Sequence, residues 1–290
     1  MNVVEFKNVS KRRKDFSIHD MNFSIPEGYV TGFIGPNGSG KTTTIQMMMD
    51  ILQIDEGEIH LFGTSNKIHQ SKQHIGFVYD DLYMYEEWNI KKMKAFIAPL
   101  YNNWNEKLFQ TYLEKFQLPF KKKIKKFSKG MKMKCSLLFA LSHEPNFIVM
   151  DEPTAGLDPI FRRELIEMIQ SLMVHEKQTV FLSTHITTDL DCIADYIIFI
   201  HEGKIILQKS MEEIREKHHI IKGKMNLLDA DIRKLFIGIR ESDVGFTALF
   251  EGDPEIFTAF NGEVVIEKAN LEDIMYFKVG GSNNVESFQA

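Results

Sequence analysis

The chain has 290 residues, about twice the length of a typical domain, so it holds one large domain or a domain with an appendage. Its 35 Lys and Arg residues and 40 Asp and Glu residues give a net charge of -5, which excludes attraction of the whole surface to nucleic acid or anionic lipid. With 43% hydrophobic and 26% charged residues, the composition is that of a folded globular protein and excludes a disordered chain.

No apolar run reaches the roughly 18 to 20 residues that cross a bilayer. The first residues lack the basic-then-apolar layout of a secretion signal, and the two cysteines, Cys135 and Cys192, form no C-x-x-C pair. These features predict a chain that spans no membrane and works in a reducing cytoplasm.

The order of the predicted elements indicates an α/β core with additions. Alternating apolar and polar residues predict strands at 3–9, 18–25, 29–34 and 58–62. Apolar residues recur every three or four positions over 88–118, which predicts amphipathic helices. Near-continuous apolar runs then alternate with helical segments, as in a parallel sheet covered on both faces; these runs lie at 147–150, 179–183 and 196–200. Beyond about Lys209, short mixed elements predict a small α+β lobe.

One loop carries the strongest chemical signal in the chain. It fits the pattern G-x-x-x-x-G-K-[ST] between a predicted strand and a predicted helix, so its backbone amides can cradle phosphate oxygens. Lys41 would contact the β and γ phosphates and the Thr42 hydroxyl would bind Mg²⁺. The candidate nucleotide-binding residues are Gly35, Pro36, Asn37, Gly38, Ser39, Gly40, Lys41, Thr42 and Thr43.

A second signal lies where the apolar run at 147–150 ends in Asp151-Glu152. The carboxyl edge of a parallel sheet is where α/β proteins place their chemistry. We expect Asp151 to hold the Mg²⁺ shell and Glu152 to take a proton from an attacking water, as a general base does in hydrolysis.

Three further stretches narrow the class: D-E-P-T-A-G-L-D at 151–158, S-T-H at 183–185 and F-S-K-G-M at 127–131. With the phosphate loop, they make the chain resemble the ATP-binding subunits of ABC transporters over about residues 3–210. The resemblance implies an α/β fold with a P-loop ABC-type ATPase domain over 1–210, which contains an antiparallel β subdomain and a helical subdomain at about 85–140. A small α+β lobe over 211–290 would follow.

The resemblance also implies that two subunits clamp two ATP molecules head to tail. Ser128 and Gly130 would close on the γ-phosphate bound by the partner subunit, and Asp158 would communicate between the two sites. His185 would hydrogen-bond the γ-phosphate. Mg²⁺ and ATP are the expected cofactors. The second ATPase subunit could be another copy of this chain or a related one.

Three positions depart from the family pattern. Lys129 stands where the signature usually has glycine, and Asp80 replaces a glutamine near the Mg²⁺ site, where it becomes a candidate metal ligand. Arg13 occupies the place of the aromatic residue that usually stacks on adenine, with Phe16 as the alternative.

The expected partners include an integral-membrane permease, whose short helix would dock on residues 79–88, although packing alone can explain this aromatic segment. The lysine run at 121–126 is either a solvated face or a site close to the inner leaflet. Within the family, the chain is similar to ATPases of bacterial exporters of amphipathic peptides, antibiotics or lipids, including exporters of staphylococcal phenol-soluble modulins. This similarity implies a peripheral protein at the cytoplasmic face of the membrane.

Two other functions remain open from the sequence. One is a soluble ABC-type switch acting on nucleic acid or ribosomes, which the single cassette and the absence of a long coiled coil disfavour, so we expect no nucleic-acid partner. The other is a nucleotide-binding regulatory module without turnover, which Asp80 and Lys129 motivate.

Overall fold

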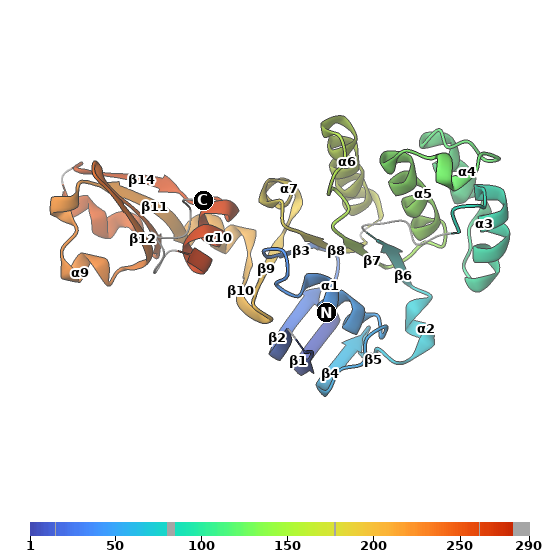
Figure 1. Ribbon diagram of the computed structural model, residues 1–290, viewed down its shortest axis with the longest axis horizontal. Helices are drawn as coiled ribbons and strands as arrows, with labels where there is room; N and C mark the ends of the chain where they lie inside the picture. Colours follow the sequence, from blue (N-terminus) through green and yellow to red (C-terminus); the bar gives the residue numbers. More distant parts are fainter. Residues whose placement is uncertain (15, 80–84, 177, 261, 281–290) are drawn as a thin grey trace. The chain divides into compact units, whose positions relative to one another are not determined.

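The computed structural model describes residues 1–14, 16–79, 85–176, 178–260 and 262–280 (Figure 1). The chain forms two compact units, one from Met1–Ile186 and Ile193–Gln208 and the other from Thr187–Cys192 and Lys209–Ala290. Within the described residues, no helix has both the length and the apolar character that a bilayer crossing requires. The boundary predicted at residue 210 stays a proposal, because the division into two units also falls at helix α7 (Thr187–Ile193).

The first unit begins with a four-stranded antiparallel sheet in the order β2-β1-β4-β5. In β2, Met21, Phe23 and Ile25 are buried at every second position, as expected for a strand with one face on a core. Phe23 stacks on Phe6 of β1 with ring centroids 4.3 Å apart. The strands are β1 (Asn2–Arg12), β2 (Ser17–Pro26), β4 (Glu56–Leu61) and β5 (Thr64–Ser65).

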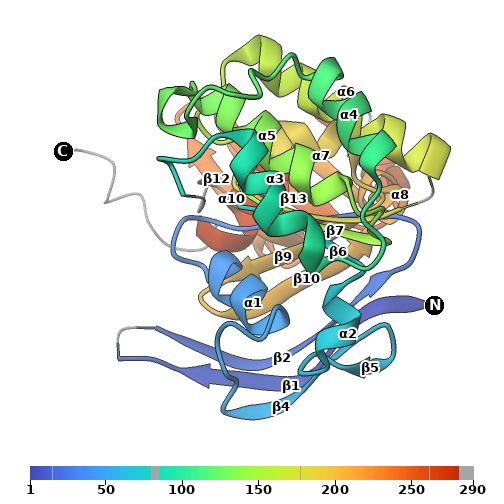
Figure 2. The same ribbon diagram turned by 90° about the vertical axis from the view of Figure 1, so that its right-hand side faces the viewer.

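The second sheet of this unit has six strands in the order β10-β9-β3-β8-β7-β6. Every residue of β3, β7 and β8 is buried, which explains the continuous apolar runs in the sequence. The core of the unit lies between the two sheets, with apolar residues of α1 on it, and Figure 2 shows α1 in that position. The strands are β3 (Val30–Ile34), β6 (Ile75–Val78), β7 (Phe147–Asp151), β8 (Thr179–Thr184), β9 (Tyr196–His201) and β10 (Lys204–Ser210).

The parallel pairing brings three strand ends to one edge. Ile34 at the end of β3 lies opposite Thr184 of β8, and Asp151 at the end of β7 lies opposite Ser183. The segments that follow β3, β7 and β8 therefore meet at this edge of the sheet.

The helices of the first unit include three that begin at side-chain caps. Asn89, Asn105 and Ser128 accept hydrogen bonds from the backbone N–H groups of the first turns of α3, α4 and α5. Helix α5 packs on β6 and contacts α3 and α4. The helices are α1 (Lys41–Met48), α2 (His69–Lys72), α3 (Ile90–Ile97), α4 (Glu106–Lys115), α5 (Lys129–Leu141) and α6 (Pro159–Glu176), with 3-10 turns at Ala98–Leu100 and Ile124–Lys126.

The second unit is an antiparallel sheet in the order β12-β13-β11-β14, with α10 against β12 and β13. Its core contains Ile221, Phe246, Phe250 and Phe257. The elements are α7 (Thr187–Ile193), α8 (Met211–Lys217), β11 (His218–Gly223), α9 (Ala230–Arg233), β12 (Phe236–Ser242), β13 (Gly245–Glu251), β14 (Val264–Lys268) and α10 (Leu271–Gly280), with 3-10 segments at Met225–Leu227 and Pro254–Phe260.

A buried histidine lies at the start of β11, one of the two inner strands of this sheet. The His218 side chain is fully buried, and its Nε2 lies 3.4 Å from Glu251 Oε2. Lys209 and Lys278 also pair with Glu251. Burial lowers the pKa of His218, although the nearby Glu251 carboxylate opposes that shift.

A second contact of this unit involves α7. Arg215 Nη2 donates to the Asp191 carbonyl of α7 over 2.7 Å.

Candidate functional site

The phosphate loop, residues 35–42, joins β3 to the first turn of α1. Gly40 has φ +111°, and a Cβ there would lie 2.7 Å from Cζ of Phe16. Glycine is therefore required at this position on both conformational and steric grounds. Helix α1 begins directly after it at Lys41, so the N-terminal amides of α1 belong to the loop.

Lys41 is held inside the loop. Its Nζ donates to the carbonyl oxygens of Gly35 at 2.8 Å and Pro36 at 3.2 Å, and it lies 3.1 Å from Glu152 Oε1. Only 6% of the Lys41 side chain is exposed. These contacts fix the ammonium group at the edge of the sheet where β3 and β7 end.

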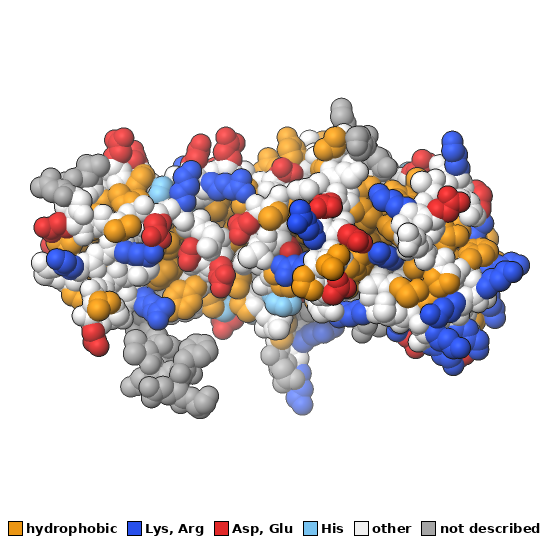
Figure 3. All heavy atoms as spheres, turned by 90° about the horizontal axis from the view of Figure 1, so that it is seen from above, with side chains coloured by type: hydrophobic (Ala, Val, Ile, Leu, Met, Phe, Trp, Pro, Cys, Tyr) orange, Lys and Arg blue, Asp and Glu red, His pale blue; other side chains and the backbone are white. Residues whose placement is uncertain are grey.

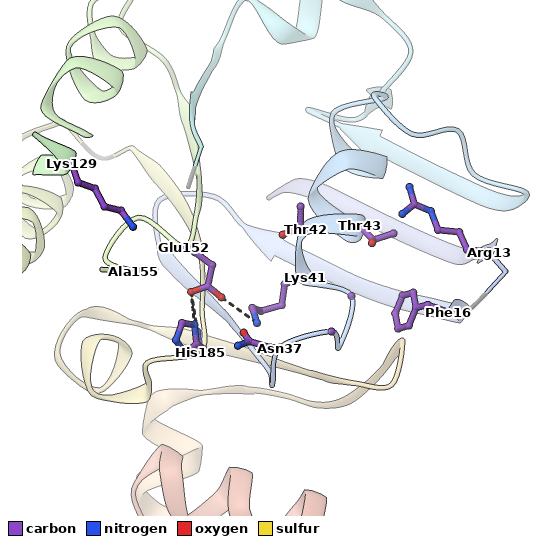
Figure 4. Close-up of a pocket in the computed structure, with 12 residues that line it drawn as sticks. Arg13, Phe16, Asn37, Lys41, Thr42, Thr43, Lys129, Glu152, Ala155 and His185 are labelled. Atoms are coloured by element: carbon purple, nitrogen blue, oxygen red, sulfur yellow. Dashed lines mark hydrogen bonds and ion pairs between the residues drawn. The ribbon is translucent and has the colours of Figure 1, made fainter. Parts of the chain in front are cut away.

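Glu152 joins the lysine to a histidine. Its Oε2 lies 2.8 Å from His185 Nδ1 and also accepts a hydrogen bond from the His185 backbone N–H at 3.3 Å. Figure 4 shows the carboxylate between Lys41 and His185. Glu152 has φ +47°, so the backbone leaves the extended conformation of β7 at this residue. The Glu152 side chain therefore projects from the turn that follows β7.

Ser183 connects the two acids at the end of β7. Its Oγ donates to Asp151 Oδ1 over 2.5 Å and accepts from the Glu152 backbone N–H over 3.1 Å. The sequence alone predicted no role for Ser183. The parallel register of β7 and β8 explains its place, because it sets Ser183 near the end of β8 opposite Asp151 at the end of β7.

These groups open into a cavity of about 660 Å³, within the usual range for ligand sites. It is lined by Arg13, Phe16, Asn37, Gly38, Gly40, Lys41, Thr42, Thr43, Lys129, Glu152, Ala155 and His185 (Figure 4). Its charged lining includes three cationic side chains and one carboxylate, which favours an anionic ligand. The buried Ser39 Oγ has no hydrogen-bond partner in the described part of the chain. Loop amides, cations and volume together fit a nucleoside triphosphate.

Both candidates for stacking on the base lie at one end of this cavity. Phe16 is half-buried and Arg13 is exposed, and the Arg13 backbone N–H donates to the Phe16 carbonyl over 2.9 Å. Figure 4 places Arg13 and Phe16 beside Thr43, whereas Glu152 and His185 lie at the other end. The Phe16 ring contacts the loop at Gly40, which makes it at least as well placed as Arg13.

The other predicted site residues lie outside the set that lines this cavity. Ser128 caps α5, and Asp158 caps α6 by accepting from the backbone N–H groups of Ile160 at 3.1 Å and Phe161 at 3.0 Å. Gly130 lies close to the Phe161 ring, so a Cβ on Gly130 would come within 3.2 Å of that ring. Asp80 lies outside the described residues.

An aromatic cluster follows residues 80–84, the part of the predicted permease dock at 79–88 that lies outside the described residues. The Tyr85 and Trp88 rings stack at 4.5 Å, and Phe96 meets Trp88 edge-on at 5.7 Å. Tyr85 is 61% exposed and Phe96 is 51% exposed, so these rings reach the surface. Figure 3 shows basic side chains gathered at the end of the first unit that holds α3 and α4.

Comparison with known proteins explains this combination of loop, acids and histidine. A family model described as ABC transporter matches residues 18–155. The lantibiotic transport ATP-binding protein SrtF of Streptococcus pyogenes is 33% identical over 67% of this chain and 85% of its own length. The chain belongs to the family of ABC transporter ATP-binding proteins.

Two further comparisons show how much of this ABC ATPase resembles known proteins, one in sequence and one in structure. The bacitracin transport ATP-binding protein BcrA of Enterococcus faecalis is 28% identical over 96% of this chain and 97% of its own length. A solved ATP-binding subunit of an ABC transporter superposes with a TM-score of 0.67 at 25% identity, over 73% of this chain and 92% of that chain.

These findings confirm the predicted α/β fold and the predicted ATPase activity. As a family member, the chain binds and hydrolyses ATP, and subunits of this family dimerise and work with membrane permeases. The likeness to ATPases of phenol-soluble modulin exporters stays a prediction.

Proposed function

We propose that this ABC ATPase powers the export of an amphipathic peptide or antibiotic through a separate membrane permease. The observation that carries the proposal is the likeness to a bacitracin transport ATP-binding protein, which extends over nearly the whole chain and so includes the second unit. The lantibiotic relative supports the same cargo class. We place the subunit at the cytoplasmic face of the membrane, where ATP is available to a permease.

Lys41 and Glu152 would divide the work of hydrolysis. Phosphate oxygens compete with Glu152 for the Lys41 ammonium, because a phosphate carries more negative charge than one carboxylate. Glu152 is then free to accept the proton of the attacking water. His185, which contacts Glu152 through Nδ1, would present its other ring nitrogen to the γ-phosphate.

The residues present suit a Mg²⁺ ion that is held mainly by its substrate. The described chain contains no group of three or more His, Cys, Asp or Glu side chains with metal-binding geometry. Mg²⁺ usually keeps several waters and takes one or two protein ligands together with substrate phosphates. The Thr42 hydroxyl, exposed in the cavity, and Asp151 would supply them, with Asp80 as a further candidate. Bound Mg²⁺ would neutralise charge that develops on the phosphates.

A second subunit would complete the site head to tail. The exposed hydroxyl of Ser128 and the backbone N–H of Gly130 begin α5, where the helix dipole favours an anion such as the partner's γ-phosphate. Asp158 would transmit the state of one site to the other through α6, which it caps.

The aromatic cluster of Tyr85, Trp88 and Phe96 is the proposed dock for the permease. Exposed aromatic rings are suited to receive a short amphipathic helix. The lysine run at 121–126 lies near this cluster in the fold, since Lys123 and Lys125 both pair with Glu87. These pairs hold the pKa of Glu87 down to about 2 and leave fewer lysines of the run for a lipid surface.

Transport by inverted membrane vesicles tests the proposal. The chain is co-expressed with a candidate ABC permease from the same organism, and ATP-dependent uptake of labelled bacitracin, a lantibiotic and a phenol-soluble modulin is measured. We expect uptake of at least one peptide with wild-type chain and none with Glu152→Gln, which serves as the matched inactive control. ATP hydrolysis without uptake of any peptide, or recovery of ribosomes in place of a permease, would reject the exporter function.

A further inference from the structure

Lysines from two segments that are distant in the sequence lie side by side in the first unit. The Lys91 backbone N–H, in the first turn of α3, donates to the Phe120 carbonyl over 3.3 Å. Asn89 Nδ2, just before α3, donates to the Lys121 carbonyl over 3.3 Å. These contacts place the start of α3 beside the lysine run at 121–126. The lysine surface consists of the exposed residues Lys91, Lys92, Lys121 and Lys122.

The lysine surface has no counter-charge in the described part of the chain. None of its four ammonium groups forms an ion pair there, whereas Lys123 and Lys125 of the same run pair with Glu87. The first turn of α3 contains no acidic residue, although a helix N-terminus favours negative charge. Residues 85–126 carry ten lysines and four glutamates in a chain whose net charge is -5. The lysines therefore repel one another, and an anionic partner would stabilise them.

Aromatic and apolar side chains border the lysine surface. Lys92 Nζ lies 4.4 Å from the centre of the Trp88 ring, and Phe96, one turn further along α3, meets the same ring edge-on. Phe96 is 51% exposed and Leu100 is 58% exposed. Tryptophan with lysine beside it is typical of the headgroup region of a bilayer, because the ring contacts lipid while the ammonium contacts phosphate.

The chemistry of this surface favours anionic lipid over nucleic acid. Residues 85–126 contain no arginine, the side chain whose planar guanidinium binds phosphates and bases through two parallel hydrogen bonds. Lysine acts as a point charge, and clustered lysines are attracted to an anionic leaflet without a fixed contact geometry. Figure 3 shows basic side chains gathered at the end of the first unit that holds α3 and α4.

We propose that the lysine surface and Trp88 bind the anionic lipid headgroups of the membrane, beside the proposed permease dock. The proposal rests on the membrane location given under the proposed function, but the lipid contact is one that the chain makes without the permease. Each lysine close to an anionic leaflet strengthens binding about five-fold, so the four together strengthen it about 100-fold or more. This attachment would concentrate the subunit at the leaflet in which its permease lies.

Co-sedimentation of the purified full chain with lipid vesicles tests the proposal. One set of vesicles is phosphatidylcholine alone, and the other contains about 30% phosphatidylglycerol, which supplies a negative surface potential. We expect wild type to bind the anionic vesicles only, and to be released by high salt. A quadruple variant should bind them about 100-fold more weakly; it carries Lys91→Gln, Lys92→Gln, Lys121→Gln and Lys122→Gln.

The matched control variant loses the same number of charges from other surfaces. It should bind the anionic vesicles nearly as wild type does, because its substitutions lie outside residues 85–126. Circular dichroism and ATP hydrolysis in solution confirm that both variants are folded, since neither set of lysines lines the nucleotide cavity. The control replaces four exposed lysines through Lys67→Gln, Lys204→Gln, Lys217→Gln and Lys224→Gln.

Tryptophan fluorescence locates the contact within the chain. The two tryptophans are Trp88 and Trp104, so Trp104→Phe leaves Trp88 as the sole source of the signal. We expect its emission to shift to shorter wavelength when anionic vesicles are added, because the ring leaves water for the headgroup region. Trp88→Phe, which keeps Trp104, should show no shift.

Equal vesicle binding by wild type and the quadruple variant would overturn the proposal, as would an unshifted Trp88 emission in the bound chain. Tighter binding of single-stranded RNA than of anionic vesicles would assign the lysine surface to nucleic acid instead. If the chain binds anionic vesicles but supports no peptide uptake, only the exporter function fails. If it supports uptake but does not bind the vesicles, only the lipid contact fails.

Discussion

The Lys41 ammonium and the Glu152 carboxylate form an ion pair at 3.1 Å, between the loop after β3 and the turn after β7. The two side chains are only 6% and 15% exposed, so solvent screens the pair weakly. A phosphate group that binds Lys41 must therefore displace the Glu152 carboxylate from the Lys41 ammonium. In this arrangement, nucleotide binding also releases Glu152, the proposed general base.

Replacing Lys41 with alanine should remove most of the affinity for ATP. The substitution deletes the cation in the middle of the cavity and leaves the Glu152 carboxylate facing the phosphates. We expect a loss of about 100-fold or more in calorimetric titration with MgATP. Lys132→Ala, which removes a paired lysine outside the cavity, should bind as wild type does.

Replacing Glu152 with glutamine should separate binding from turnover. The amide keeps the shape of the side chain and can still accept from the Lys41 ammonium, but it cannot accept a proton from water. We expect steady-state ATP hydrolysis to fall by about 100-fold to 10,000-fold while ATP affinity is kept or rises. Turnover that survives this substitution would remove Glu152 as the base.

Ser183→Ala should lower both stability and activity. Without the hydroxyl, Asp151 Oδ1 loses a buried hydrogen-bond donor, whereas the Glu152 backbone N–H keeps the Ser183 carbonyl as a partner at 3.1 Å. We expect the free energy of unfolding in urea to fall by about 1–3 kcal/mol, and ATP hydrolysis to fall because the Asp151 side chain is held less firmly. Ser171→Ala, at an exposed position of α6, is the control and should change neither quantity.

Two substitutions at Asp158 distinguish its capping role from its proposed signalling role. Asparagine can still accept from the N–H groups of Ile160 and Phe161, whereas alanine cannot. We expect Asp158→Ala to lower the free energy of unfolding by about 1 kcal/mol and Asp158→Asn to leave it nearly unchanged. If the carboxylate charge also couples the two sites, Asp158→Asn should reduce cooperativity of ATP hydrolysis in the dimer despite normal stability.

The buried His218 should make the second unit less stable in mild acid. Because burial places its folded pKa below the ordinary value of 6.5, the unfolded chain binds more protons than the folded chain as the pH falls through that value. The free energy of unfolding should therefore decrease from about pH 7 to pH 5. Glu251, whose pKa is lowered by its lysine and histidine neighbours against the effect of burial, adds to this loss only below its ordinary value of 4.5.

Chemical unfolding across this pH range, monitored by fluorescence and circular dichroism, checks the expectation. His218→Gln should flatten the dependence, whereas His69→Gln, at an exposed position of α2, should not. An identical slope in wild type and His218→Gln would show that other groups cause the acid sensitivity.

The sequence predicted those parts of the site whose residues are neighbours along the chain. The phosphate loop and the Asp151-Glu152 pair were found because each is a contiguous pattern attached to an apolar strand. The role of Ser183 and the place of Lys129 depend on contacts between distant segments, which strand order and helix packing decide. Local patterns do not contain that information.

The sequence predicted a small α+β lobe beyond Lys209 but no strand at His218–Gly223, where the structure has β11, one of the two inner strands of the sheet in the second unit. It begins with His218 and His219, which are buried although polar, so the segment shows no clear apolar alternation. Its position between β13 and β14 decides its conformation, since both neighbours pair with it. Tertiary pairing has overridden the local signal here.

The assignment of α7 to the second unit has a consequence for any shortened form of the protein. Thr187–Cys192 belongs to that unit, yet these residues precede β9 and β10 in the sequence. A chain stopped after Ser210 would retain α7 but lose Arg215, which donates to the carbonyl of Asp191. No single cut in the sequence separates the two units, so a form that ends at Ser210 would keep α7 without the rest of the second unit.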